Sequence, residues 1–274
     1  MTHSRLLKVL SAVSVVLFLV VWVFPIAWTA ITSLKLPVDI FAYPPSLSFS
    51  PSPSNYQEVL GGDESVLSGL LTSVIISVTS TFLAMLFGAP VAYVFARIKM
   101  LGKGVLALYT MFTYLIPRIG LVIPLFVIMR KLDLTDTYIG LIIVYLSFAL
   151  PLAIWLMVAY FEVVPIEIEE AARCDGASRL LALWHVVLPQ VRGGMAATTV
   201  FVFITAWNEF LFAIVLGGDN VHPITVSMYD FISVQQTLWG PLTATAVIAM
   251  LPVVALGLVA QKEIVKGLSA GAVK

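Results

Sequence analysis

The residue types that carry enzymatic chemistry are few in this chain of 274 residues, and their spacing supports no catalytic or metal site. The three histidines, His3, His185 and His222, lie far apart and show none of the spacings of a metal-binding motif. Cys174 is the single cysteine, which excludes an internal disulfide and any cluster of cysteine ligands. The sequence also lacks the Gly-x-x-x-x-Gly-Lys-Ser/Thr loop that binds nucleotide phosphates. We therefore expect no catalytic residue, no metal ligand and no cofactor bound by this chain, and any ATP must be bound by another chain.

A polar segment at 169–178 favours a different role, the docking of another protein. Its acidic residues fall early in a short helix expected after Pro165, where negative charge suits the helix N-terminus. Gly176 can end this helix in a left-handed conformation, and Ser178 can cap the next helix. The expected helix-turn-helix presents small residues on its surface, although an ordinary loop with a chance Glu-Ala-Ala is the alternative. The residues that we expect to dock a partner are Glu169, Glu170, Ala171, Ala172, Asp175 and Gly176.

Two charged residues, Arg118 and Glu209, lie inside long apolar stretches, where charge is costly and usually faces a cavity or a partner. Each lies about 14 residues from the expected inner end of its stretch, or about 21 Å along a helix. The matching depth predicts that the two side chains pair, or that both line a path across the membrane. The alternative is that Arg118 extends towards the outer headgroups, since Arg130 ends the same stretch.

Trp207 and Asn208 precede Glu209, so one turn offers an aromatic face beside a hydrogen-bonding amide. Sugars are commonly held by that combination, and we include both residues among the candidates for a translocation path. Structural support is the alternative, because Trp also anchors helices at the interface and Asn can bond a neighbouring helix.

The elements that must position these residues are membrane-spanning helices. The chain is 60% hydrophobic and 11% charged, against about 25% charged in a soluble domain. Its formal net charge of zero argues against nucleic acid as a partner. Because about 20 apolar residues cross a bilayer as a helix, we expect an all-α membrane protein with a single domain over 1–274. Pro25 could perturb the first span and Pro151 could split the fourth. The six expected spans are approximately 7–29, 67–95, 104–129, 138–160, 194–216 and 240–261.

The distribution of basic residues sets the orientation. With the N-terminus inside, eleven Lys and Arg residues fall in inner segments and three in outer loops, and Arg118 lies within a span. Both termini are therefore expected in the cytoplasm. The charged loop 161–193, which contains the docking segment, also falls on the cytoplasmic side.

Several motifs occur in the order found in a known family. Glu170–Gly176 resembles the E-A-A-x-x-D-G motif of ABC-importer permeases, and Val186-Val187-Leu188-Pro189 resembles the I-x-L-P that follows it, without the family's second proline. Asn55-Tyr56 and the third-span prolines resemble the smaller permease of maltose-type importers. Trp207–Phe210 matches the W-N-E-F signature of that group, and 264–274 resembles its G-L-T-A-G-A-V-K tail, with Ser for Thr.

This resemblance implies the six-helix fold of type I ABC-importer permeases and a multi-pass location in the cell (inner) membrane. It implies a second permease subunit, an ATP-binding cassette ATPase dimer that uses ATP and Mg, and an extracytoplasmic solute-binding protein. The docking segment would meet the ATPase, and tail residues Gly267, Ser269 and Gly271 would approach it too. The implied cargo is a sugar or oligosaccharide, and a sugar or polyol phosphate is the alternative. The sequence does not indicate which sugar is carried, or which permease holds it.

Two other classes have less support. A membrane enzyme would need a nucleophile beside a base, and no histidine or clear aspartate lies within an expected span. A channel or a carrier driven by a solute gradient would have no use for an ATPase-docking loop.

Overall fold

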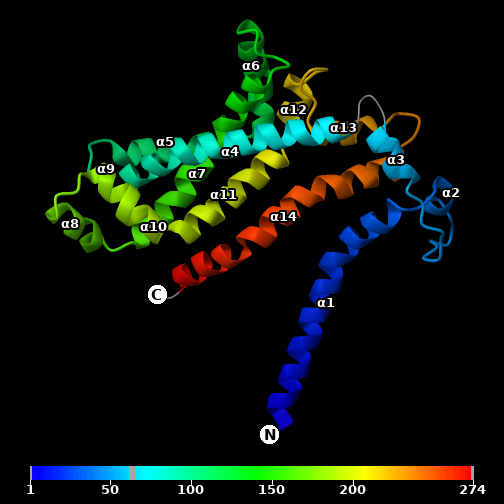
Figure 1. Ribbon diagram of the computed structural model, residues 1–274, viewed down its shortest axis with the longest axis horizontal. Helices are drawn as coiled ribbons and strands as arrows, with labels where there is room; N and C mark the ends of the chain where they lie inside the picture. Colours follow the sequence, from blue (N-terminus) through cyan, green and yellow to red (C-terminus); the bar gives the residue numbers. More distant parts are fainter. Residues whose placement is uncertain (1, 62–65, 273–274) are drawn as a thin grey trace. The chain divides into compact units, whose positions relative to one another are not determined.

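The computed structural model describes residues 2–61 and 66–272, which fold as two compact units that we treat separately. The first comprises residues up to 67 together with 227–251, and the second comprises 68–226 with 252–272. Among the described residues the fold is helical, and the only β pairing is an isolated bridge between Ile232 and Thr237. The helices are shown in Figure 1. Their bounds are α1 Thr2–Thr32, α2 Pro37–Ile40, α3 Ser54–Gly61, α4 Val66–Arg97, α5 Lys103–Leu115, α6 Arg118–Lys131, α7 Tyr138–Val163, α8 Ile166–Cys174, α9 Arg179–Ala182, the π-helix η1 Leu183–Val187, α10 Leu188–Gln190, α11 Arg192–Trp207, α12 Leu211–Leu216, α13 Ile224–Asp230 and α14 Trp239–Ala272.

Four of the described helices are long and apolar enough to cross a membrane, and two bent helix pairs raise the number to six if each pair is one span. The four are in α1, α4, α7 and α14. α1 and α7 continue through Pro25 and Pro151, so neither proline breaks its helix. The nearly all-helical architecture is the fold class expected from the sequence, and the expected number of six spans is reached if each bent pair is one span.

The stretch 104–129 is not one straight helix, because α5 and α6 meet at an angle of 93° (Figure 1). Pro117 explains the break. A residue before proline is disfavoured in the helical region, and Ile116 has extended backbone angles, φ −61° and ψ 126°. The stretch 194–216 is also interrupted, since residues 208–210 separate α11 from α12.

In the first unit, a buried asparagine secures the segment that follows α1. Asn55 donates from Nδ2 to the carbonyl oxygens of Ser33 and Lys35, each at 2.9 Å. Lys35 donates to the carbonyl of Ser46 at 2.7 Å, and its ammonium lies 5.0 Å from the Trp28 ring. No residue is buried in the most apolar 18-residue window of α1, so the surface of this window remains available to lipid or a partner.

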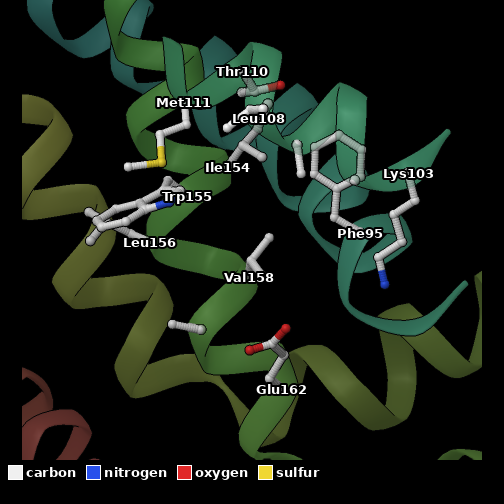
Figure 2. A pocket seen from close by; sticks show the side chains of 13 residues that line it. Phe95, Lys103, Leu108, Thr110, Met111, Ile154, Trp155, Leu156, Val158 and Glu162 are labelled. Carbon is white, nitrogen blue, oxygen red and sulfur yellow. The ribbon is translucent and has the colours of Figure 1, made fainter. Parts of the chain in front are cut away.

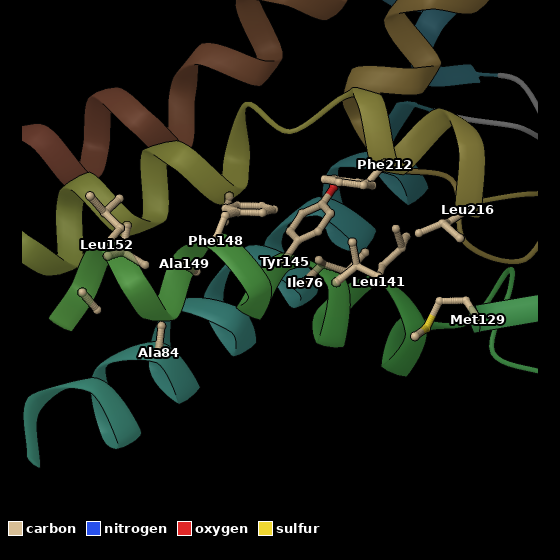
Figure 3. Packing of buried hydrophobic residues seen from close by; sticks show 14 of the residues in the cluster. Ile76, Ala84, Met129, Leu141, Tyr145, Phe148, Ala149, Leu152, Phe212 and Leu216 are labelled. Atoms are coloured by element: carbon tan, nitrogen blue, oxygen red, sulfur yellow. The ribbon is translucent and has the colours of Figure 1, made fainter. Parts of the chain in front are cut away.

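The second unit has two apolar clusters. One joins α4, α6, α7, α11 and α12 around Tyr145, Phe148 and Phe212 (Figure 3). The rings of Phe148 and Phe212 stack at 6.3 Å between centroids. The other joins α4 and α7 to η1 and α10, with Phe161 and Val187 fully buried. The second cluster therefore packs the segment after α8 onto two of the membrane-spanning helices.

Candidate functional site

The segment expected to dock a partner folds as two short helices with an ordered turn. α8 carries acidic residues in its first turn, Gly176 has φ +92°, and the Ser178 hydroxyl accepts a hydrogen bond from the Leu181 amide at 3.2 Å. The predicted left-handed glycine and the predicted serine cap are both confirmed. α8 packs against α9 and η1, which makes the segment a folded unit rather than a loose loop.

The six docking candidates differ in exposure. Glu170, Ala171, Asp175 and Gly176 are exposed and Ala172 is half-buried, so these residues form an accessible surface. Glu169 is 6% exposed and faces the chain's own α4, where the Tyr93 hydroxyl donates to its carboxylate at 2.5 Å. Glu169 therefore contacts this chain rather than the outside.

Arg118 and Glu209 form an ion pair, so the predicted pairing is confirmed. The Arg118 side chain is 36% exposed, whereas that of Glu209 is 3% exposed. The guanidinium carbon also lies 4.1 Å from the Phe148 ring centroid, a cation–π geometry. Since Arg118 begins α6 and Glu209 lies between α11 and α12, the pair joins the interruptions of two apolar stretches.

Glu209 also organises the interruption in which it lies. Its Oε1 accepts a hydrogen bond from the Phe212 amide at 3.0 Å, which caps the N-terminus of α12. Its carbonyl oxygen accepts hydrogen bonds from the hydroxyls of Tyr145 at 3.3 Å and Thr225 at 3.1 Å. The Phe212 amide and the Glu209 carbonyl, two backbone groups in this interruption, thus both have partners, as an interrupted span requires.

The two neighbours of Glu209 differ from one another. Trp207 is 4% exposed and stacks on Phe203 at 5.5 Å, so neither of its faces is open to a ligand. Asn208 is exposed, and its Nδ2 donates to the Ile204 carbonyl at 2.9 Å. Of Trp207 and Asn208, only Asn208 has a group that could contact a solute, its amide oxygen.

A cavity of about 500 Å³ lies between α5 and α7, lined by Trp155 and Met111 among other apolar side chains (Figure 2). Lys103 and Glu162 are the charged residues of its lining. The cavity lacks the array of hydroxyl and amide groups that would hold a sugar, so its chemistry suits an apolar occupant.

Sequence reasoning missed an aspartate that joins two outer loops. Asp136 accepts hydrogen bonds from the Asn220 amide and side chain at 3.1 and 2.8 Å, and from the Val221 amide at 2.8 Å. Burial raises the pKa of Asp136, but these hydrogen bonds outweigh burial and hold the pKa below its usual range. Tyr93 and Arg97 were missed as well, and their spacing of four on one helix face is the signal that could have found them.

The remaining expectations concern metal ligands and the C-terminal tail. Among the described residues, no group of three or more His, Cys, Asp or Glu could hold a metal ion. The backbone of α14 is helical to Ala272. The side-chain surroundings of Gly267, Ser269 and Gly271 lie outside the described part of the chain, so the tail contact stays a prediction.

Comparisons with known proteins agree on one family. Residues 84–269 match the model described as "Binding-protein-dependent transport system inner membrane component". The chain is 34% identical to the trehalose transport system permease protein SugB of Mycobacterium tuberculosis, over 93% of this chain and 91% of that protein. It is 30% identical to the trehalose/maltose transport system permease protein MalG of Thermococcus litoralis, over 100% and 99%. A crystal structure of a bacterial ABC transporter that imports the acidic polysaccharide alginate contains a chain with the same fold. The TM-score is 0.79 at 24% identity, covering 96% of this chain and 98% of that one.

Proposed function

This chain belongs to the family of binding-protein-dependent transport system inner membrane components, and we propose that it imports a sugar or oligosaccharide together with a second permease. As a family member it is a multi-pass permease subunit of an ABC importer, and ATP hydrolysis belongs to a separate subunit. The choice of cargo rests on one observation: the chain is similar, over nearly its whole length, to permeases named for trehalose and maltose.

The Arg118–Glu209 pair favours an uncharged sugar over a sugar or polyol phosphate. Apart from Lys8 at the inner edge of the first span, Arg118 is the one basic residue expected within a span. Its charge is already opposed by the Glu209 carboxylate, and its face lies against Phe148. A phosphate would compete with the Glu209 carboxylate for the guanidinium, and displacing that carboxylate would leave a buried charge unpaired.

We assign the ATPase-docking surface to the exposed part of α8 and the turn after it, Glu170, Ala171, Asp175 and Gly176, with Ala172 beside them. The neighbouring Leu180 and Leu181 are 64% and 49% exposed, on the side that the distribution of charges places in the cytoplasm. Exposed apolar side chains beside polar ones are typical of a surface that binds another protein. The ATPase dimer bound there would supply the ATP and Mg chemistry that this chain lacks.

For the translocation path, we propose that Arg118, Glu209 and Asn208 lie at its wall. The exposed edge of Arg118 and the amide of Asn208 are the polar groups that could face a passing sugar. Trp207 has the supporting role in this proposal, because it packs against Phe203 within the unit. On the outer side, a solute-binding protein would deliver the sugar.

Docking can be tested by cross-linking in the assembled transporter. Glu170→Cys in a Cys174→Ser background should cross-link to the ATPase subunit through a short bifunctional reagent. Asp133→Cys, in a turn that the charge distribution places outside, is the matched control and should not. A cross-link from the control alone, or from neither cysteine in an ATPase-containing complex, would contradict the docking surface.

The cargo can be tested by ATPase stimulation in the same complex. The solute-binding protein, loaded in turn with trehalose, maltose and a panel of other sugars and sugar phosphates, is added to the reconstituted importer. At least one neutral sugar should stimulate ATP hydrolysis. Stimulation by a phosphate ester alone would favour the alternative cargo, and no stimulation by any sugar would refute the carbohydrate assignment.

A further inference from the structure

One docking candidate is turned inward. Glu169 lies in the first turn of α8 between exposed neighbours, Ile168 and Glu170, yet it is 6% exposed. A buried carboxylate is rare in proteins and persists only where charged or hydrogen-bonding groups compensate it. The partners of Glu169 therefore show what this position does.

All the partners of Glu169 come from the inner end of one apolar helix, α4. The Tyr93 hydroxyl donates to Glu169 Oε1 at 2.5 Å, and Arg97 Nε lies 3.7 Å from Glu169 Oε2. Arg97 also donates to the carbonyl of Val164, just before α8 begins. Because Tyr93 and Arg97 are four residues apart, they lie on the same face of α4. This face thus holds both the entry to α8 and its first turn.

Apolar packing surrounds these polar contacts. The Tyr93 ring meets Phe161 of α7 edge-on at 5.9 Å between centroids. Both belong to the cluster that contains Leu183 and Val187 of η1. Water is therefore largely excluded from the Tyr93–Glu169 contact, and a hydrogen bond in such surroundings is stronger and more directional than one in water.

The ion pair between Arg97 and Glu169 is longer than a direct hydrogen bond. Arg97 Nε and Glu169 Oε2 are buried, and neither has a hydrogen-bond partner. Their separation of 3.7 Å exceeds the usual N–H···O distance of about 2.9 Å by about 0.8 Å. A small shift of α8 along α4 would change this contact, so the pair is sensitive to the position of α8.

We propose that Glu169, Tyr93 and Arg97 form a relay that transmits movement of the docking helix α8 to the membrane-spanning helix α4. The proposal rests on the proposed function, because it assumes that an ATPase moves α8. It assigns different roles to adjacent acidic residues: Glu170 faces the ATPase, and Glu169 is a positioning residue that faces the chain's own span. Without the relay, α8 would move while α4 followed it incompletely.

The test measures sugar uptake and ATP hydrolysis in the same proteoliposomes, containing the complete importer and its solute-binding protein. Tyr93→Phe removes the hydroxyl but keeps the ring that packs on Phe161. We expect it to lower the sugar transported per ATP hydrolysed at least threefold, while the same amount of ATPase co-purifies. Tyr109→Phe, at an exposed tyrosine of α5, is the matched control and should leave this ratio unchanged.

A second variant and the docking cross-link keep the outcomes distinct. Arg97→Lys keeps the charge but changes the geometry, and it should lower the same ratio. If both variants transport as much sugar per ATP as the unmodified importer, the relay is refuted. A loss of uptake that merely follows a loss of bound ATPase would also refute it, since the residues would then act in folding or docking. Failure of the Glu170→Cys cross-link, in contrast, would refute the docking surface itself.

Discussion

The Arg118–Glu209 ion pair leads to a prediction about which of its two residues is costlier to remove. Arg118→Ala leaves a carboxylate whose side chain is 3% exposed without its cation, whereas Glu209→Gln leaves a guanidinium that is already 36% exposed. Water can solvate the guanidinium but not the carboxylate. We therefore expect Arg118→Ala to destabilise the protein much more than Glu209→Gln does.

The magnitudes follow from burial. Breaking a buried pair by removing one partner costs about 3–5 kcal/mol, so Arg118→Ala should change the unfolding constant by roughly two to four orders of magnitude. Glu209→Gln keeps an amide oxygen that can still accept from the Phe212 amide, and should cost about 1–2 kcal/mol. Adding Glu209→Gln to Arg118→Ala removes the unpaired charge, and should recover about 1–3 kcal/mol.

The assay is equilibrium unfolding of the purified chain in bicelles by a titrated denaturing detergent, followed by tryptophan fluorescence. Arg130→Ala, at the exposed far end of α6, is the control and should change the free energy of unfolding by no more than about 0.5 kcal/mol. If Glu209→Gln were as destabilising as Arg118→Ala, burial of the carboxylate would not set the cost. The same conclusion would follow if the double variant were no more stable than Arg118→Ala alone.

Three further predictions concern single contacts. Acidification should loosen the loop that Asp136 holds. The pKa of Asp136 is lower in the folded than in the unfolded protein, so its hydrogen bonds stabilise the fold at pH values above the unfolded pKa, and this stabilisation is lost as pH falls through the folded pKa. The measurement is hydrogen exchange of the Asn220 amide, which should become faster below about pH 4. Gly194→Ala should cost about 1–3 kcal/mol in thermal unfolding, since its new methyl group would overlap the Tyr160 ring. Ser178→Ala should cost about 1 kcal/mol by loss of the cap, measured as faster amide exchange in α9.

The apolar helices could be predicted from composition and length, but their interruptions could not be placed in space. Continuous hydrophobic runs indicate α4 and α7 directly. The same criterion treats 104–129 as one helix, although Pro117 divides it with a turn of 93°. The presence of a proline in the sequence does not show whether the helix breaks, as at Pro117, or continues, as α7 does at Pro151. Neighbouring helices decide whether the freed backbone groups are satisfied.

The Arg118–Glu209 pair was predicted from matched depth along straight helices, and the structure forms it through different geometry. Arg118 lies at the start of α6, beyond the sharp turn, and Glu209 lies in a non-helical interval. The pairing was still predictable, because a charged residue inside a membrane span usually needs a partner and these two were the candidates for each other. The chemical requirement was therefore predictable, whereas the route by which the chain meets it was not.

The different exposures of Glu169 and Glu170 were beyond sequence reasoning. Both are acidic residues near the start of one short helix, and both suit its N-terminus equally. Only the packing of α8 against Tyr93 and Arg97 turns one inward and leaves the other exposed. The cap at Ser178 and the left-handed Gly176 were predictable, because both depend on local backbone chemistry.

ATP-driven import can be measured as uptake of labelled sugar into proteoliposomes that contain this chain, its second permease and the ATPase. We expect uptake only when ATP is present on the ATPase side and loaded solute-binding protein on the other. An ion gradient should not replace ATP. Uptake by the permeases without ATPase or ATP, or uptake driven by an ion gradient, would show that this chain is not the permease of an ATP-driven importer.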